Sequence, residues 1–384
     1  MMIDSIILAP YYWALRIRHF LYDKGMKKVN RPEIPSICLG NVTVGGTGKT
    51  PHTEMIVRML SAQEQWTGKN IAVLSRGYKR KSKGFQQVCA DGTVKDYGDE
   101  PLQIKRKFPN VTVAVDASRT EGCAFLAAPE RIKESKKTMK RCKAPDFPAA
   151  DLVIMDDAFQ HRKIKADISI VLVDYSRPVF KDHLLPLGSL RDLPSRIFEA
   201  DAVIVSKCPM YMDEWQKSQW AEALGFKNFN PATCKGVNVK GKEQYLFFTS
   251  IFYDHLTPVY PEGDIRYSHS QRLILFTGIA NDTPLLKALC DSYKILRHIR
   301  FGDHHNFTTG EIRNIASIAE GYPTAVVATT EKDAQRVIDV KKVPDSLKKK
   351  LFAAPIKADF LEDGERKVFI SFLNERLNGT DPKA

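Results

Sequence analysis

The stretch SICLGNVTVGGTGKTPHTEMIVRML, from Ser36 to Leu60, decides the fold. It opens with an apolar run typical of a buried strand, passes through the glycine-rich turn TVGGTGKT at Thr43 to Thr50, and continues with apolar residues at helical spacing. A strand, a glycine-rich turn and a helix in this order are the context of a P-loop, in which backbone N–H groups wrap phosphate groups. Thr43 replaces the first glycine of the usual pattern G-x-x-x-x-G-K-[ST], but the strand and helix around it support the assignment.

The P-loop predicts a nucleotide site with a magnesium ion. Its glycines let the backbone approach phosphate groups, Lys49 would reach the β- and γ-phosphate oxygens, and Thr50 would hold Mg²⁺. Pro51 suits the first turn of the following helix. We therefore expect ATP and Mg²⁺ as cofactors and a phosphoryl-transfer reaction. The predicted nucleotide-binding residues of this turn are Gly45, Gly46, Thr47, Gly48, Lys49 and Thr50.

Further apolar, β-branched runs alternate with helical patterns along the chain. Continuous apolar strands of this kind predict a mostly parallel sheet covered by helices on both faces, in an α/β fold of the P-loop NTPase type. The runs are NIAVLSRG (70–77), VTVAVDA (111–117), DLVIMDD (151–157), ISIVLVD (168–174), DAVIVSK (201–207), RLILFTG (272–278) and TAVVATT (324–330).

The rhythm of strands and helices changes after about residue 226. An irregular, aromatic stretch follows at about 228–269, before apolar runs resume. We therefore expect a P-loop domain over residues 31–226 and a smaller α/β domain over residues 227–384 that includes this stretch as an insertion.

The N-terminal segment, residues 1–30, is expected to form a membrane-associating helix. Its apolar part ends at Leu15 and includes Tyr11, Tyr12 and Trp13, with cations following. Since roughly 20 apolar residues are needed to cross a bilayer, the pattern favours a helix lying in the interface over a spanning one. The alternative is a terminal helix packed on the core of the protein.

Composition restricts the possible partners. The excess of 58 Lys+Arg over 45 Asp+Glu gives a net charge of +13, which suits phosphorylated substrates and anionic membranes. No zinc-finger spacing, RNP-like motif or clear helix-turn-helix pattern is present, so nucleic acid is not expected. Seven scattered cysteines without a C-x-x-C pair indicate a reducing compartment and no disulfide framework.

Three acidic clusters stand out as candidates for chemistry. The strand DLVIMDD ends in Asp156 and Asp157, where a P-loop enzyme holds magnesium, and a polar turn with His161 follows. Asp99 and Glu100, between a glycine and a proline, are suited to proton transfer or metal binding. The third cluster, Asp303 to His305 in FGDHHNFT, joins an acid to two imidazoles, which also suits proton transfer.

Taken together, these segments resemble the tetraacyldisaccharide 4'-kinases of lipid A biosynthesis. The resemblance spans about Gly40 to Arg336, and no single motif carries it alone. It implies an enzyme on the cytoplasmic face of the bacterial inner membrane that phosphorylates the 4'-hydroxyl of a tetraacylated glucosamine disaccharide 1-phosphate. A lipid disaccharide and an anionic membrane surface are then the partners, with no obligate protein partner. The matching motifs are GNVTVGGTGKTP, LSRGY, GDEP, DDAFQHR, PLGSLRDLP, FTGIA, FGDHHNFT and TTEKDA.

The resemblance also implies roles for individual residues. Asp99 becomes the base that accepts the proton of the sugar hydroxyl, with His304 as its partner, while Lys49 neutralises the transferring phosphoryl group. The implied magnesium ligands are Thr50, Asp156 and Glu100. Two arginines are implied as phosphate clamps and three further residues as secondary candidates: Arg76 and Arg191 in the first group, and Asp157, Asp192 and His161 in the second.

Two positions depart from the family pattern. Ala158 replaces a glycine after the acidic strand end, so the turn lacks that residue's freedom at positive φ. Asp192 replaces a glutamate after Arg191, which shortens its reach by one methylene.

Two other classes of protein remain as alternatives. A P-loop GTPase or ATPase switch, or a metallochaperone, would use the same glycine-rich turn without an acceptor substrate. Val44 stands where one such group needs a lysine, and no convincing N-K-x-D base motif is present. A noncatalytic membrane-binding module that keeps ATP for structure is the other alternative.

Overall fold

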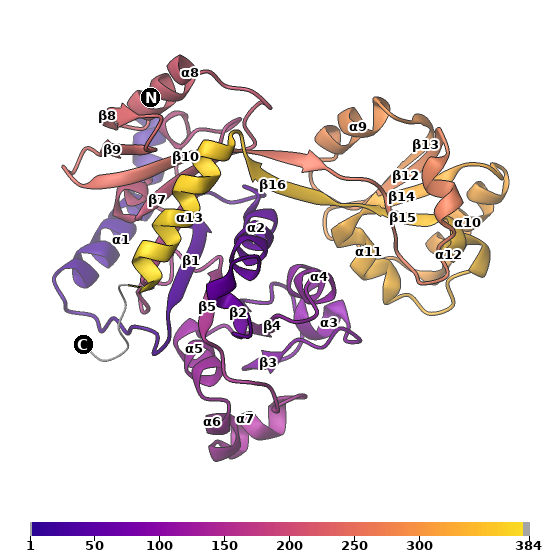
Figure 1. Cartoon of the computed structure of the whole chain (residues 1–384), viewed down its shortest axis with the longest axis horizontal. Helices are drawn as coiled ribbons and strands as arrows, with labels where there is room; N and C mark the ends of the chain where they lie inside the picture. Colours follow the sequence, from indigo (N-terminus) through magenta and orange to yellow (C-terminus); the bar gives the residue numbers. More distant parts are fainter. Residues whose placement is uncertain (1, 379–384) are drawn as a thin grey trace.

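The computed structural model describes residues 2–378, which form two sheets with helices around each (Figure 1). Residue 1 and residues 379–384, which the predicted domains include, lie outside the described residues. The large sheet has the order β3-β4-β2-β5-β1-β6-β7-β10-β9-β8, with β16 paired to β10. Its strands are β1 (Ser36–Asn41), β2 (Ile71–Ser75), β3 (Gln86–Gln87), β4 (Thr112–Val115), β5 (Leu152–Asp156), β6 (Ile168–Asp174), β7 (Ala202–Ser206), β8 (Lys227–Asn230), β9 (Lys235–Val237), β10 (Glu243–Tyr253) and β16 (Ile356–Phe360).

The centre of this sheet is parallel, as predicted. Strand β1 lies between β5 and β6, with Leu39 opposite Asp156 on one side and Asn41 opposite Leu172 on the other. The carboxyl ends of these strands therefore meet at one edge, where the P-loop follows β1. The six runs predicted before residue 226 coincide with β1, β2, β4, β5, β6 and β7.

Helices cover both faces of the large sheet. On one face α2 (Lys49–Ser61), α4 (Asp99–Lys107) and α13 (Asp363–Asn378) share one apolar core with the strands. On the other face α5 (Arg119–Ala127) packs at one end, and α1 (Met2–Asp23) and α8 (Glu214–Ala223) pack at the other. The remaining helices of this part are short and peripheral: α3 (Val94–Tyr97), α6 (Glu130–Glu134) and α7 (Lys136–Arg141).

The small sheet has the order β11-β15-β14-β12-β13 and its own apolar cores. The last two predicted runs coincide with β12 and β14, which pair in parallel. The small sheet and its helices form a second α/β unit with its own core. Its elements are β11 (Thr257–Pro258), β12 (Arg272–Thr277), β13 (Lys294–Arg300), β14 (Val326–Thr330), β15 (Leu351–Ala354), α9 (Thr283–Cys290), α10 (Thr309–Glu320), α11 (Glu331–Ile338) and α12 (Asp345–Lys350).

The structure divides the chain differently from the boundary predicted at residue 226. Strand β10 pairs in parallel with β7, so β8 to β10 extend the large sheet, and α13 returns to cover it. The stretch at about 228–269 thus contains four strands, β8 to β11, rather than being an irregular insertion. Its edge strand β8 is largely exposed and lacks the apolar run that marks a buried strand, which explains the difference.

Two long strands connect the units. Strand β10 leaves the large sheet after Phe248 and pairs antiparallel with β16, from Thr249 opposite Phe360 to Tyr253 opposite Ile356. Figure 1 shows these two strands as the arm that reaches the small unit. The small unit is therefore an excursion within the large one, and the first and last described helices, α1 and α13, both pack on the large sheet.

The helices and the cysteines bear on the membrane and disulfide expectations from the sequence. Within residues 2–378 no helix has both the length and the apolar character needed to span a bilayer. All seven cysteines are free, which agrees with the prediction of no disulfide framework.

Candidate active site

The P-loop takes the conformation that its sequence predicts. Gly45 and Gly48 lie in the left-handed region, with φ of 95° and 86°. A Cβ on Gly48 would also approach Ile251 Cδ1 to 3.1 Å, so both the backbone angle and the space favour glycine there. Thr47 is fixed from two sides, because its hydroxyl accepts a hydrogen bond from Asn41 Nδ2 (2.8 Å) and its carbonyl accepts one from Ser206 Oγ (2.8 Å).

A buried histidine holds the end of the P-loop. His52 Nδ1 lies 2.7 Å from the Gly48 carbonyl, which can only accept, so Nδ1 carries the proton. His52 Nε2 lies 2.8 Å from Thr249 Oγ1 and therefore accepts from that hydroxyl. Burial lowers the pKa of His52 to about 4, against the opposing effect of the bond to Gly48. The neutral ring thus connects the P-loop to strand β10.

Carboxylates gather at the carboxyl end of β5, beside the P-loop. Asp156 accepts a hydrogen bond from Thr53 Oγ1 (3.2 Å) and is 1% exposed. Burial raises the pKa of Asp156 to about 6, and the nearby Glu100 and Asp157 add to this effect. Lys49 Nζ lies 3.8 Å from Asp157, which also pairs closely with Arg191.

These residues fit a nucleotide-bound magnesium ion. Within residues 2–378 no group of three or more His, Cys, Asp and Glu side chains is placed to hold a metal by itself. Nucleotide enzymes hold Mg²⁺ through one or two protein ligands, waters and phosphate oxygens, so no larger group is required. Asp156 and Asp157 are oxygen donors of the kind that Mg²⁺ prefers, and they stand at the strand end beside Lys49 of the P-loop.

The turn after β5 accommodates the alanine that replaces the family's glycine. Asp157, not Ala158, adopts the left-handed conformation, with φ of 49°. Aspartate tolerates this region better than most residues. Ala158 is buried at 2% exposure, so its small side chain suits the space.

Asp99 lies between the two units. It begins helix α4, is 5% exposed, and forms a close ion pair with Arg336 of helix α11 in the small unit. His304 Nδ1 lies 3.4 Å from Asp99 and 3.1 Å from the Arg336 guanidinium. Burial alone would raise the pKa of Asp99, but the hydrogen bond from His304 and the cations Lys332 and Arg336 hold it well below its usual range.

The small unit supports this contact through a second layer of bonds. Arg336 also donates to Asp333 (2.8 Å) and to the Gly278 carbonyl (3.1 Å). Lys332 pairs closely with Glu100, the other acid at the start of α4. The structure therefore brings Asp99, Glu100 and His304 together, and it adds two cations of the TTEKDA region that sequence reasoning did not assign.

Cations line the other side of the strand ends. Burial, then Arg119 and Arg76, lower the pKa of His161 to about 4. Arg119 was not among the predicted residues, yet it is 2% exposed and donates to the carbonyl of Asp156 (2.9 Å). Arg76 is exposed, and no ion pair within the described residues involves it.

Asp192 and Arg191 have separate surroundings despite being neighbours. Arg191 donates to Asn41 Oδ1 (2.5 Å) and pairs with Asp157, so it belongs to the P-loop edge. Asp192 is buried and lies 2.6 Å from His19 Nε2 of helix α1. Helix α1 thus attaches directly to the loop that carries a site residue.

Comparisons with known proteins agree on one family. The family described as tetraacyldisaccharide-1-P 4'-kinase matches residues 5–378. The chain belongs to this family. A tetraacyldisaccharide 4'-kinase of Phocaeicola vulgatus is 35% identical over 382 residues, which cover 96% of this chain and 94% of that protein. One from Porphyromonas gingivalis is 34% identical over 375 residues, covering 95% and 94%.

A solved structure is similar in fold. The crystal structure of LpxK from Aquifex aeolicus, described as in complex with ATP, superposes with a TM-score of 0.65 at 24% identity. It covers 96% of this chain and 98% of that one. The predicted family and P-loop fold are confirmed, and the kinase family, rather than a GTPase switch or metallochaperone, accounts for the P-loop.

We predict that His52 makes stability fall with acidity. The pKa of His52 is about 4 in the folded protein and near 6.5 when unfolded, so only the unfolded state takes up this proton between those values. The contribution is complete above pH 6.5 and is lost as pH falls toward 4, on the order of 3 kcal/mol in total. Urea unfolding of the wild type and of His52→Gln across this range measures it. An unchanged pH dependence in the variant would contradict the assignment.

Proposed function

We propose that this protein transfers the γ-phosphoryl group of ATP to the 4'-hydroxyl of a tetraacylated glucosamine disaccharide 1-phosphate. Family membership along residues 5–378 supports the reaction. The observation that carries the site assignment is the position of Asp99 between the P-loop unit and Arg336 of the small unit. An acceptor bound there would lie between the P-loop and His304, where phosphate and hydroxyl have to meet.

In this reaction the sugar oxygen forms a bond to the γ-phosphorus while the bond from that phosphorus to the β–γ bridging oxygen breaks. Lys49 would neutralise charge on the transferred group, and the P-loop N–H groups would hold the remaining phosphates. Thr50, Asp156 and Glu100 would hold Mg²⁺, which supplies charge neutralisation at the β- and γ-phosphates when bound. ADP and the 4'-phosphorylated lipid are the products.

Asp99 would accept the proton of the acceptor hydroxyl. Its low pKa makes it a weak base, but it also keeps the carboxylate ionised at every working pH. Phosphoryl transfer proceeds through a loose transition state in which the hydroxyl loses its proton late, so orientation matters more than basicity. His304 and Arg336 would fix the carboxylate at the orientation that directs the hydroxyl oxygen to the phosphorus.

Helix α1 would hold the enzyme at the cytoplasmic face of the inner membrane. Trp13, Ile17 and Phe20 are 59%, 57% and 56% exposed and lie on one side of the helix at a spacing of three to four residues. The opposite side packs on the large sheet through the buried Leu15 and His19. An exposed apolar stripe beside cations suits a helix that lies in the headgroup region.

The kinase reaction is tested with tetraacyldisaccharide 1-phosphate, ATP and Mg²⁺ under mass spectrometry. We expect a mass gain of one phosphate that falls at least about a hundredfold in Lys49→Ala and Asp99→Ala, since each removes a group that acts on the reacting atoms. Lys235→Ala, at an exposed pair with Glu243, is the matched control. Folded, ATP-binding protein without a mass gain would overturn the proposed acceptor.

Arg336 is expected to set the acid limit of activity. Removing the guanidinium in Arg336→Ala leaves Asp99 buried with less positive charge, so its pKa rises and it becomes protonated at higher pH. The pH profile of kcat/KM should therefore lose activity on the acid side at a higher pH than in the wild type. Arg336→Lys should recover part of the difference. A uniform loss of activity at all pH values would indicate a structural role only.

The α1 stripe is expected to control membrane binding. Replacing Trp13, Ile17 and Phe20 with serine removes the side chains that would enter the bilayer, so vesicle binding should weaken by at least about a hundredfold. Ile265→Ser, at a residue 56% exposed in the small unit, is the control for exposed apolar surface elsewhere. Cosedimentation with lipid vesicles measures both. Equal binding of wild type and triple variant would remove α1 from the membrane interface.

A further inference from the structure

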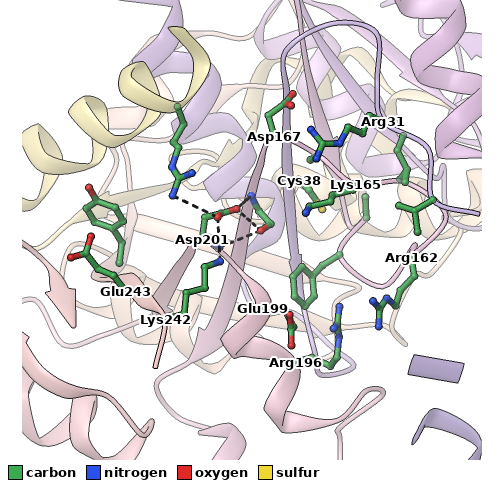
Figure 2. Close-up of a pocket in the computed structure, with 18 of the residues that line it drawn as sticks. Arg31, Cys38, Arg162, Lys165, Asp167, Arg196, Glu199, Asp201, Lys242 and Glu243 are labelled. Atoms are coloured by element: carbon green, nitrogen blue, oxygen red, sulfur yellow. Dashed lines mark hydrogen bonds and ion pairs between the residues drawn. The ribbon is translucent and has the colours of Figure 1, made fainter. Parts of the chain in front are cut away.

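A cavity lies away from the P-loop, at the amino-terminal edge of the large sheet. It has a volume of about 710 Å³ and is lined by the starts of β6 and β7, by the loop that follows β5, and by the segment after α1 (Figure 2). Ser169 and Asp201 mark the amino ends of β6 and β7 at this cavity. The carboxylates of the proposed active site stand at the opposite ends of the strands. The mechanism described above does not use this space.

Arg196 is the unusual residue of the cavity. It stands in the 3-10 helix η3 (Pro194–Glu199), with its guanidinium 5.5 Å from the centre of the Phe159 ring. Its Nε is fully buried and has no hydrogen-bond partner, and within residues 2–378 no ion pair involves its side chain. Burial and the neighbouring Arg162 lower the pKa of Arg196. Arg196 as a whole is half-buried, and Asp192, Glu199 and Asp23 attract its charge without forming an ion pair with it. Its enclosed Nε is the donor for which the described residues supply no acceptor.

Other cations stand on the same side of the cavity. Figure 2 shows Arg31, Lys165 and Arg162 together with Arg196 along one wall. Arg162 is engaged by Asp23 (2.6 Å), whereas Arg31 and Lys165 have no carboxylate within ion-pair distance in the described part of the chain. Asp167, which lies beside Arg31 in Figure 2, accepts a hydrogen bond from Ser36 Oγ (2.6 Å), so the cations of this wall outnumber its acids.

The carboxylates of the opposite wall are already satisfied. Asp201 accepts from Ser169 Oγ (2.7 Å) and lies 3.5 Å from Lys242, and Glu243 pairs with Lys235 (2.9 Å). Glu199, at the floor between the walls, pairs closely with Lys240. Glu199 also attracts Arg196 electrostatically, but no carboxylate of the described residues lies within ion-pair distance of Arg196.

The basic wall adjoins the proposed membrane-facing surface. Val29 lines the cavity and is 41% exposed, and Met26, in the same segment after α1, is 68% exposed. Phe20, on the exposed stripe of α1, precedes this segment by less than two helical turns. A ligand that joins a negative headgroup to apolar chains matches cations in a pocket with apolar side chains at its rim.

We propose that this cavity binds the phosphate headgroup of an anionic membrane phospholipid, with Arg196 as its principal donor and Arg31 and Lys165 at its mouth. The inference rests on the proposed docking of α1 to a membrane, and it adds a defined headgroup site to that contact. The planar guanidinium presents paired donors that match two phosphate oxygens, and its enclosed Nε has no partner among the described residues. A bound phospholipid would fix the segment after α1 relative to the sheet.

The test compares vesicles that contain phosphatidylglycerol in phosphatidylcholine with vesicles of phosphatidylcholine alone. We expect Arg196→Gln to weaken binding to the anionic vesicles by about tenfold and to leave binding to neutral vesicles unchanged. Arg313→Gln, an exposed arginine of α10 with the same change in charge, should alter binding by about twofold at most. Arg196→Lys keeps the charge but loses the fork, so it should restore only part of the affinity.

Further variants and ligands distinguish binding at the headgroup site from binding through α1 or to free phosphate compounds. Because a buried variant can fail to fold, the double variant Arg31→Gln, Lys165→Gln, with both changes at exposed residues, should show the same selective loss. If the wild type does not bind neutral vesicles, the proposed membrane contact of α1 is wrong. If Arg196→Gln and Arg313→Gln weaken binding to anionic vesicles equally, the headgroup site is wrong. Thermal protection by soluble glycerol 1-phosphate that depends on Arg196, without any effect on vesicle binding, would also overturn the lipid assignment.

Discussion

Negative charge at the carboxyl ends of the parallel strands is the constraint around which this structure is arranged. Asp156 is buried at the end of β5, and Asp157 and Glu100 lie close enough to raise its pKa. Buried carboxylates are costly unless cations or hydrogen bonds compensate them. The compensating groups come from four separate parts of the chain: Lys49 of the P-loop, Arg119 of α5, Arg191 of the loop before η3, and Lys332 of the small unit.

This distribution explains why the two units meet where they do. Asp99 and Glu100 begin α4 in the large unit, and their partners Arg336 and Lys332 belong to α11 in the small one. Each ion pair is worth little if exposed, but Asp99 and Arg336 are both nearly inaccessible to solvent. Separating the units would break this pair and leave the Asp99 carboxylate without its guanidinium partner. The small unit thus contributes two cations, Arg336 and Lys332, that pair with acids of the candidate site.

The proposed membrane helix is joined to the same charge network. His19 of α1 bonds Asp192, and the adjacent Arg191 holds Asp157 beside Lys49. Tyr11 of α1 adds a bond from its hydroxyl to the Arg191 carbonyl (2.8 Å). Only a few covalent and hydrogen bonds therefore separate the exposed stripe of α1 from the P-loop lysine.

Much of the fold was predictable from the sequence because its central strands are buried on both faces. Apolar runs such as those of β5 and β6 carry a strong signal, and the turn between β1 and α2 has a pattern with few other uses. The edge strand β8 was not predictable, since an exposed strand needs no apolar run. The return of α13 to the large unit was likewise not predicted, because the sequence of a helix does not indicate which sheet the helix packs against.

The candidate site was predictable only in part, for a related reason. Lys49, Asp156 and Asp99 stand in local patterns that indicate their chemistry, whereas the pairing of Asp99 with Arg336 joins residues 237 positions apart. Buried Arg119 has no sequence signal at all. It occupies its place because the carbonyl of Asp156 and the carbonyl of Asp116 need donors in a space that water does not enter.

Strand β10 brings these features into one mechanical unit. Its first half is fixed in the large sheet against β7, and its second half, paired with β16, carries the small unit. At the point where the strand changes partner, Thr249 donates to His52, which in turn bonds the left-handed Gly48 of the P-loop. A rotation of the arm about this point would have to displace either the buried histidine or the P-loop glycine. Strand β10 therefore connects the phosphate cradle to the arm that carries the small unit, with its Arg336 and His304, and the arm begins beside the P-loop.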